Sequence, residues 1–85
     1  TQKLKLFPNP FNQQITLSFY LEKSSFVKIR VQNILGKTML YQNLGNKFSG
    51  EHQITIDLGH HLPIGTYLLE FDYLEQIERI KIIKK

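Results

Sequence analysis

The chain is short and basic, with 85 residues, 11 Lys and Arg, 7 Asp and Glu, and a formal net charge of +4. This length supports one small hydrophobic core and excludes most enzyme folds, so we expect a single domain over residues 1–85. With no cysteine, its stability must come from ordinary packing, which the 41% hydrophobic and 12% aromatic fractions support. The apolar runs fall far short of the roughly 20 residues that cross a bilayer, so we expect no membrane insertion.

Apolar and polar residues alternate with a period of two, which is typical of strands with one buried face. The alternation covers residues 15–21, 27–31, 54–58 and 67–71, and shorter strands are expected near 3–7 and 76–83. About seven short strands separated by turn residues predict an all-β fold, an immunoglobulin-like antiparallel β-sandwich.

The first unusual segment is residues 7–11, Phe-Pro-Asn-Pro-Phe. Each proline fixes its own φ and has no N–H to donate to a sheet. We therefore expect this corner to end or kink the first strand at a sheet edge, with Phe7 and Phe11 as apolar anchors.

Turns separate the expected strands. Residues 33–36, Asn-Ile-Leu-Gly, predict a tight hairpin, because Asn33 can bond the backbone at the start of a turn and Gly36 tolerates a positive φ. Another hairpin turn is expected at 72–75. Tyr67 follows Gly65 at the start of the penultimate strand, a position typical of the tyrosine corner, in which the hydroxyl bonds the backbone a few residues upstream.

Candidate catalytic and metal-binding side chains are sparse. His52, His60 and His61 could supply zinc ligands, but adjacent side chains in extended chain point in opposite directions, so we expect a polar loop pair and no metal or cofactor. Glu70 and Asp72 share a face as an acid/base pair would, but they lie opposite the apolar side of their strand, which favours solvated charges. No serine stands in a nucleophile-elbow sequence, so the sequence favours a protein that is not an enzyme.

Nucleic-acid binding is one alternative. Lys28 and Arg30 share a face, and we expect Tyr20 in a neighbouring strand, as a stacking platform requires. The other interpretation is a solvent-facing sheet whose lysines discourage edge pairing. Because basic residues do not interleave with aromatics in any run, we expect no nucleic-acid partner.

Four segments occur in a defined order, and they are residues 7–12 (FPNPFN), 27–37 (VKIRVQNILGK), 62–69 (LPIGTYLL) and 81–85 (KIIKK). Together they resemble the C-terminal sorting domain of the type IX secretion system over nearly the whole chain. The family often has Tyr-Asp where this chain has Gln32-Asn33, and Asn33 keeps the turn chemistry. The family's frequent Gly-x-His is kept at residues 50–52, which favours a structural role for His52.

The resemblance implies an export signal that needs no catalysis. In the family, a cargo enters the periplasm by an amino-terminal signal peptide, and the appended sandwich is recognised by the outer-membrane translocon and a shuttle protein. A surface sortase typically removes the domain, leaving the cargo at the outer-membrane surface or outside the cell. The implied partners are this machinery, the sortase and a cargo domain in cis.

Most of the alternating apolar residues are expected to pack in the core. Recognition by a partner must therefore use the sheet edges, the proline corner (residues 7–11) and the tail (residues 81–85). We expect the machinery to contact Lys81, Lys84 and Lys85, with Ile82 and Ile83 as apolar anchors, as the terminal segment adds to another sheet through its backbone. The family-motif residues are expected chiefly to fix the fold; they are Pro8, Asn9, Pro10, Phe11, Asn33, Gly36, Gly65 and Tyr67. The alternative for the lysines is a solvated, fraying tail.

Two further alternatives stay open. An immunoglobulin-like or fibronectin-like accessory module, carbohydrate-binding or spacer, would present exposed aromatics, for which Tyr20, Tyr41 and Tyr73 are the candidates. Native sequence continuing beyond Lys85 would favour that module. The edge strands could also pair two copies into a homodimer.

Overall fold

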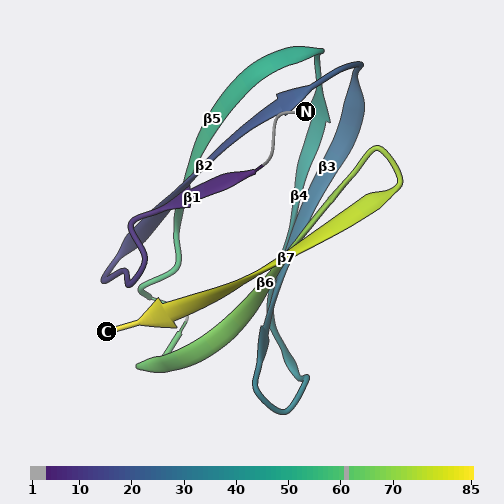
Figure 1. Cartoon of the computed structure of the whole chain (residues 1–85). Coiled ribbons are helices and arrows are strands. Elements are labelled where there is room, and N and C mark those ends of the chain that lie inside the picture. Colours follow the sequence, from purple (N-terminus) through teal and green to yellow (C-terminus); the bar gives the residue numbers. More distant parts are fainter. Residues whose placement is uncertain (1–3, 61) are drawn as a thin grey trace.

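A computed structural model describes residues 4–60 and 62–85. In these residues, seven antiparallel strands form two facing sheets (Figure 1). The strands are β1 (Lys5–Phe7), β2 (Gln14–Leu21), β3 (Ser25–Asn33), β4 (Thr38–Lys47), β5 (Gly50–Asp57), β6 (Gly65–Tyr73) and β7 (Gln76–Lys84). The predicted all-β sandwich is confirmed, and no described segment forms a helix of the length and apolarity that crossing a membrane requires.

The sheets have three and four strands, in the orders β1-β2-β5 and β4-β3-β6-β7. In a constant-type immunoglobulin domain the fourth strand lies beside the fifth. Here β4 pairs with β3 instead, because a tight turn returns the chain directly along β3. The chain then crosses to the other sheet at β5, which pairs with β2.

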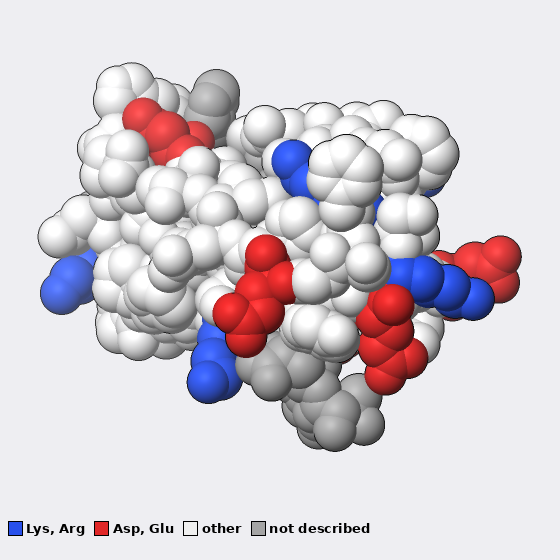
Figure 2. All heavy atoms as spheres, turned by 90° about the horizontal axis from the view of Figure 1, so that it is seen from above, with Lys and Arg blue, Asp and Glu red and all other residues white. Residues whose placement is uncertain are grey.

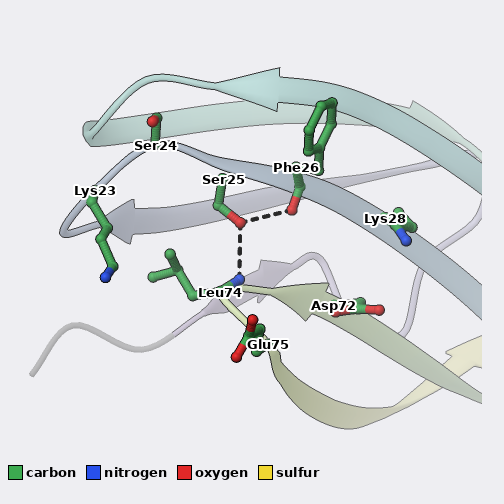
Figure 3. A pocket seen from close by; sticks show the side chains of 8 residues that line it. All are labelled: Lys23, Ser24, Ser25, Phe26, Lys28, Asp72, Leu74 and Glu75. Carbon is green, nitrogen blue, oxygen red and sulfur yellow. Dashed lines mark hydrogen bonds between the residues drawn. The ribbon is translucent and has the colours of Figure 1, made fainter.

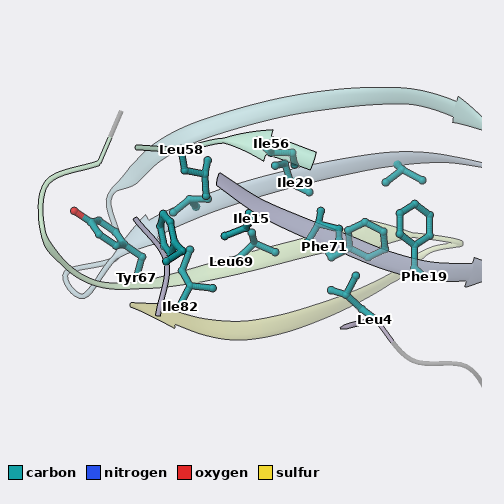
Figure 4. Close-up of a cluster of buried hydrophobic side chains, with 14 of the residues drawn as sticks. Leu4, Ile15, Phe19, Ile29, Ile56, Leu58, Tyr67, Leu69, Phe71 and Ile82 are labelled. Atoms are coloured by element: carbon teal, nitrogen blue, oxygen red, sulfur yellow. The ribbon is translucent and has the colours of Figure 1, made fainter. Parts of the chain in front are cut away.

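The alternation of apolar and polar residues along the strands determines which side chains form the core. Val27, Ile29 and Val31 of β3 are buried, and so are Tyr67, Leu69 and Phe71 of β6, which face the apolar side of β2. Figure 4 shows Ile29, Leu69 and Phe71 meeting Ile15 and Phe19 of β2 between the sheets. Every second residue of the central strands is therefore committed to packing, as the sequence predicts.

The predicted turns form largely as expected. At the β3–β4 hairpin, Leu35 N and Lys37 N each donate to Asn33 Oδ1 at 2.9 Å, and Gly36 has a φ of 86°. The β6–β7 turn is centred one residue later than the expected segment, with Leu74 and Glu75 both at positive φ, the geometry of a two-residue hairpin that usually takes Asn-Gly.

The amino-terminal expectations are partly wrong. Strand β1 begins at Lys5, and Lys3, with which the strand was expected to begin, lies outside the described residues. Phe11 is fully buried, as predicted, but Phe7 is 45% exposed and does not anchor the core. Phe7 closes β1, a three-residue edge strand whose alternation turns its side chain outward.

Candidate recognition site

The proline corner lies against the last strand. Asn9 Nδ2 donates to the carbonyl oxygen of Lys81 at 2.9 Å, and Ile83 N donates to Asn9 Oδ1 at 3.0 Å. A carboxamide carries the same donor and acceptor as a peptide group, so one side chain acts as a neighbouring strand would. The flanking prolines have no N–H, so the corner meets β7 through the Asn9 side chain.

Phe11 continues this contact with its backbone. Phe11 N donates to Ile83 O and Lys85 N donates to Phe11 O, both at 2.9 Å, which forms a parallel bridge between Phe11 and Lys84. The Phe11 ring is fully buried in the core. The corner is thus fixed to the tail by backbone bonds and to the core by an aromatic ring.

The tail therefore has a neighbour on both edges. One edge of β7 pairs with β6, from Gly65 opposite Lys84 to Tyr73 opposite Gln76. The other edge is occupied by residues 9–11 over residues 81–85. Strand addition by the tail, which we expected from the sequence, is blocked in the folded domain because its backbone groups are already bonded.

The tail side chains divide between core and solvent. Ile82 is fully buried, so its side chain packs in the core and is not accessible to a partner of the folded domain. Lys81, Ile83 and Lys85 are exposed, and Lys84 is half-buried. The side chains that a partner can contact are therefore the three lysines and Ile83.

Other family-motif residues make contacts within the fold. Tyr67 Oη donates to the carbonyl oxygen of Pro63 at 2.6 Å, which confirms the tyrosine-corner contact. Figure 4 shows the Tyr67 hydroxyl pointing out of the apolar cluster at its end. Gly65 begins β6 opposite Lys84, so the strand that holds the tail starts directly after this corner.

Glu70 departs from its predicted role. It is buried on the outer face of the four-stranded sheet, where Arg30 Nη2 donates to Oε1 at 2.6 Å and Arg79 Nε donates to Oε2 at 2.8 Å. Hydrogen bonds from Arg30, and then from Arg79, hold the pKa of Glu70 below its usual 4.5, although burial acts in the other direction. The prediction of a solvated charge was wrong because β3 and β7 each bring an arginine opposite Glu70.

Tyr73 was expected to be an exposed aromatic and is buried instead. Burial, followed by the hydrogen bond to Glu78, raises the pKa of its phenol to about 12. Of the three tyrosines that the sequence offered for a carbohydrate platform, Tyr20 and Tyr41 are exposed, and they lie in different sheets.

The histidines have structural partners. The His52 ring nitrogen Nε2 lies 2.6 Å from Phe48 O, and the ring stacks on Phe19 at 5.4 Å between centroids. His60 Nδ1 lies 2.7 Å from Gln13 Nε2. His61 lies outside the described residues, and the described part of the chain gathers no group of three or more His, Cys, Asp or Glu that could hold a metal ion.

The residues that a nucleic-acid stacking platform would require do not come together. Tyr20 lies in β2, in the opposite sheet from Lys28 and Arg30, because the chain changes sheets between β2 and β3. Arg30 is bonded to Glu70 and has Tyr41 of β4 beside it. On the face in Figure 2, basic and acidic side chains are scattered, with apolar or neutral surface between them.

A depression of about 630 Å³ lies at the end of the sandwich remote from the tail (Figure 3). Ser25 Oγ accepts from Leu74 N and donates to Phe26 O, both at 2.9 Å, so this hydroxyl links the start of β3 to the β6–β7 turn. Lys23, Lys28, Asp72 and Glu75 bring charges of both signs to the lining. Both hydrogen bonds of the Ser25 hydroxyl go to backbone groups, so this side chain holds two neighbouring segments of the fold together.

Fold and site together define the class of protein: a small β-sandwich whose distinguishing feature is a basic carboxyl-terminal strand fixed by an amino-terminal proline corner. The family model for the secretion system C-terminal sorting domain matches residues 5–85. The chain belongs to this family, that of the type IX secretion sorting domains, as its four motifs predicted. Members are non-catalytic secretion tags, and the domain carries a signal for export by this system. A search of curated proteins found no match.

Proposed function

We propose that residues 1–85 form one domain that acts as the export signal of a cargo joined in cis, recognised by the outer-membrane translocon and its shuttle protein. The observation that carries this proposal is the immobilised tail, with Lys81, Ile83 and Lys85 exposed on a strand bonded along both edges. Because the backbone that carries these side chains is already fixed, binding has to order only their rotamers, which suits a signal that must be read specifically.

In this proposal the cargo passes through the periplasm, and a surface sortase removes the domain after translocation. The cargo then stays at the outer-membrane surface or leaves the cell. The domain itself is no enzyme, needs no cofactor, inserts into no membrane and binds no nucleic acid. Salt-dependent retention on a DNA column would contradict the last point.

The test is a reporter with a signal peptide and this domain, expressed in a type IX-competent host. Deleting residues 81–85 would also remove buried Ile82 and the partners of Asn9, so it tests folding as much as recognition. The sharper variant changes Lys81, Lys84 and Lys85 to Gln, which keeps the backbone contacts. We expect the secreted fraction to fall several-fold.

The matched control changes Lys5, Lys23 and Lys47 to Gln, removing the same charge away from the tail. Secretion equal to that of the unchanged domain in the tail variant would overturn the role of the lysines. A reporter that is never secreted, even with the unchanged domain, would favour the accessory module instead.

An edge-strand homodimer is the second arrangement to test. β4 is an edge strand, and residues 38–46 carry no charged side chain or proline to discourage pairing. Light scattering on the purified chain decides between one copy and two. A Gln42→Lys change, at an exposed position of the same strand, should leave a monomer unaffected and dissociate a dimer that pairs through β4.

A further inference from the structure

Three aliphatic side chains are strongly exposed near the tail, and the fold does not use them. Ile34 and Leu35, at the tip of the β3–β4 hairpin, are 81% and 87% exposed. Ile64, just before β6, is 79% exposed. Isolated exposed aliphatic residues are ordinary, but several at one end of a small domain mark a contact surface.

Strand register brings these residues to the same end as the tail. Asn33, directly before the hairpin tip, pairs with Tyr67, and Gly65 pairs with Lys84. The hairpin tip, the start of β6 and the end of β7 therefore lie at one end of the four-stranded sheet. Figure 1 shows all three in the lower part of the molecule.

The hairpin holds its exposed residues in a fixed position. Besides the two backbone N–H groups bonded to the Asn33 carboxamide, Gly36 N donates to Asn33 O at 3.0 Å and Asn33 N donates to Lys37 O at 2.9 Å. Such a tip pays little entropy when it binds, as a preorganised contact should.

Charge is divided along the same sheet. Four lysines lie at the tail end, namely Lys37, Lys81, Lys84 and Lys85. The acidic residues of β6, β7 and their turn run from the middle of the sheet to its other end, and they are Glu70, Asp72, Glu75 and Glu78. That other end also carries Lys28, Arg30 and Arg79, so its charge is mixed. Among the described residues, the end with the aliphatic tip carries lysines without acidic residues, which is complementary to carboxylates.

We propose that the hairpin tip and the tail form one docking surface, comprising Ile34, Leu35, Lys37, Ile64, Ile83 and Lys85, for a protein partner with an apolar patch rimmed by carboxylates. The inference rests on the proposed export function, and it makes the β3–β4 hairpin a recognition element as well as a fold element. Lys81 and Ile83 lie along β7 while the hairpin projects from the sheet end (Figure 1). A protein surface shaped to the end of the sheet would contact both.

The test compares two double variants of the reporter fusion. Ile34→Ser with Leu35→Ser removes the apolar tip, and Phe26→Ser with Phe48→Ser removes two side chains that are 64% and 81% exposed elsewhere. We expect secretion to fall about tenfold or more in the first and to change less than about twofold in the second. Lys37→Glu should lower secretion about fivefold or more, since it opposes the partner's carboxylates.

Thermal unfolding of each purified chain checks that the variants fold. Unchanged secretion in the folded tip variant overturns the docking surface, although the export function stands as long as the unchanged domain is secreted. Failure of the unchanged domain to be secreted refutes the export function itself. Sedimentation with phosphatidylglycerol vesicles decides the partner class: binding that disappears in the tip variant would make the partner a membrane and overturn the proposal.

Discussion

The two halves of β7 are held by different interactions. Residues 81–85 lie between β6 and the proline corner, with backbone and carboxamide bonds on both edges. Residues 76–80 pair with β6 on one edge, and their side chains reach across the sheet, where Arg79 bonds Glu70 and Glu78 bonds Tyr73. The tail half, residues 81–85, is thus held mainly by hydrogen bonds to its backbone. The turn half, residues 76–80, is held in addition by hydrogen bonds of charged side chains.

The two halves also differ in the distance along the chain between partners. The Asn9 contacts join residues 72 and 74 positions apart, whereas those of Arg79 and Glu78 join residues 9 and 5 positions apart. Local contacts close small loops, and distant ones require most of the chain to be in place. Order in the tail therefore depends on the complete sandwich, whereas these contacts of the turn half lie within the β6–β7 hairpin.

Among substitutions that weaken the contacts of the tail half, we expect the largest effect from Phe11→Ala, in the corner that pairs with it. It empties a fully buried site in the core, so we expect the free energy of unfolding to fall by about 3–5 kcal/mol. That is a large share of the roughly 4–13 kcal/mol expected for a domain of this size. Urea denaturation followed by circular dichroism measures the change.

Phe7→Ala is the matched control, because Phe7 belongs to the same corner but is half-exposed. We expect a loss below about 1 kcal/mol. Similar losses in the two variants would mean that the corner is not fixed to the core through Phe11.

Local contacts of the fold could be predicted from the sequence, and distant ones could not. Alternation identified the strands, and the Asn33 turn and the Tyr67 bond to Pro63 followed because their partners are at most four residues apart. The pairing of Asn9 with the tail was missed, since nothing local tells which strand a carboxamide meets. The one available clue was a polar side chain with both donor and acceptor between two prolines that cannot donate.

The ion pairs of Glu70 on the outer face of the four-stranded sheet could not be predicted for the same reason. Alternation places Glu70 on the polar face of β6 but does not show what lies across from it. The two arginines come from strands 40 and 9 residues away. Their cross-strand positions became known only with the order β3-β6-β7.

The contact between Arg79 in the turn half and Glu70 of β6 can be weakened with Glu70→Gln, which keeps the shape of the side chain and removes its charge. We expect a loss of about 1–3 kcal/mol in unfolding free energy at neutral pH, toward the lower value because both arginines are about half exposed. Glu75→Gln, at the exposed turn, removes the same charge and should change stability by less than about 0.5 kcal/mol. Equal effects would show that net charge, and not the paired carboxylate, sets the stability.

The same carboxylate predicts an acid dependence. Because the pKa of Glu70 is lower in the folded protein than its usual 4.5, its stabilising contribution is complete above that value and is lost as the pH falls through the folded pKa. Denaturation at several pH values between about 6 and 3 should show a shallower acid loss in Glu70→Gln than in the unchanged chain. Parallel curves would contradict the assignment to Glu70.

The smallest effect should come from Asn9→Asp, which tests whether the corner acts as a strand. The acid keeps an acceptor for Ile83 N but loses the donor to Lys81 O and places a negative oxygen beside that carbonyl. Because the site is exposed, water replaces part of the loss, and we expect about 1 kcal/mol. Amide hydrogen exchange gives the sharper measurement: Ile83 should exchange several-fold faster, while Lys85, bonded to Phe11 O, should change less. Asn12→Asp adds the same charge one residue beyond Phe11, and if it accelerated exchange at Ile83 equally, the charge would be responsible and the carboxamide would not be acting as a strand.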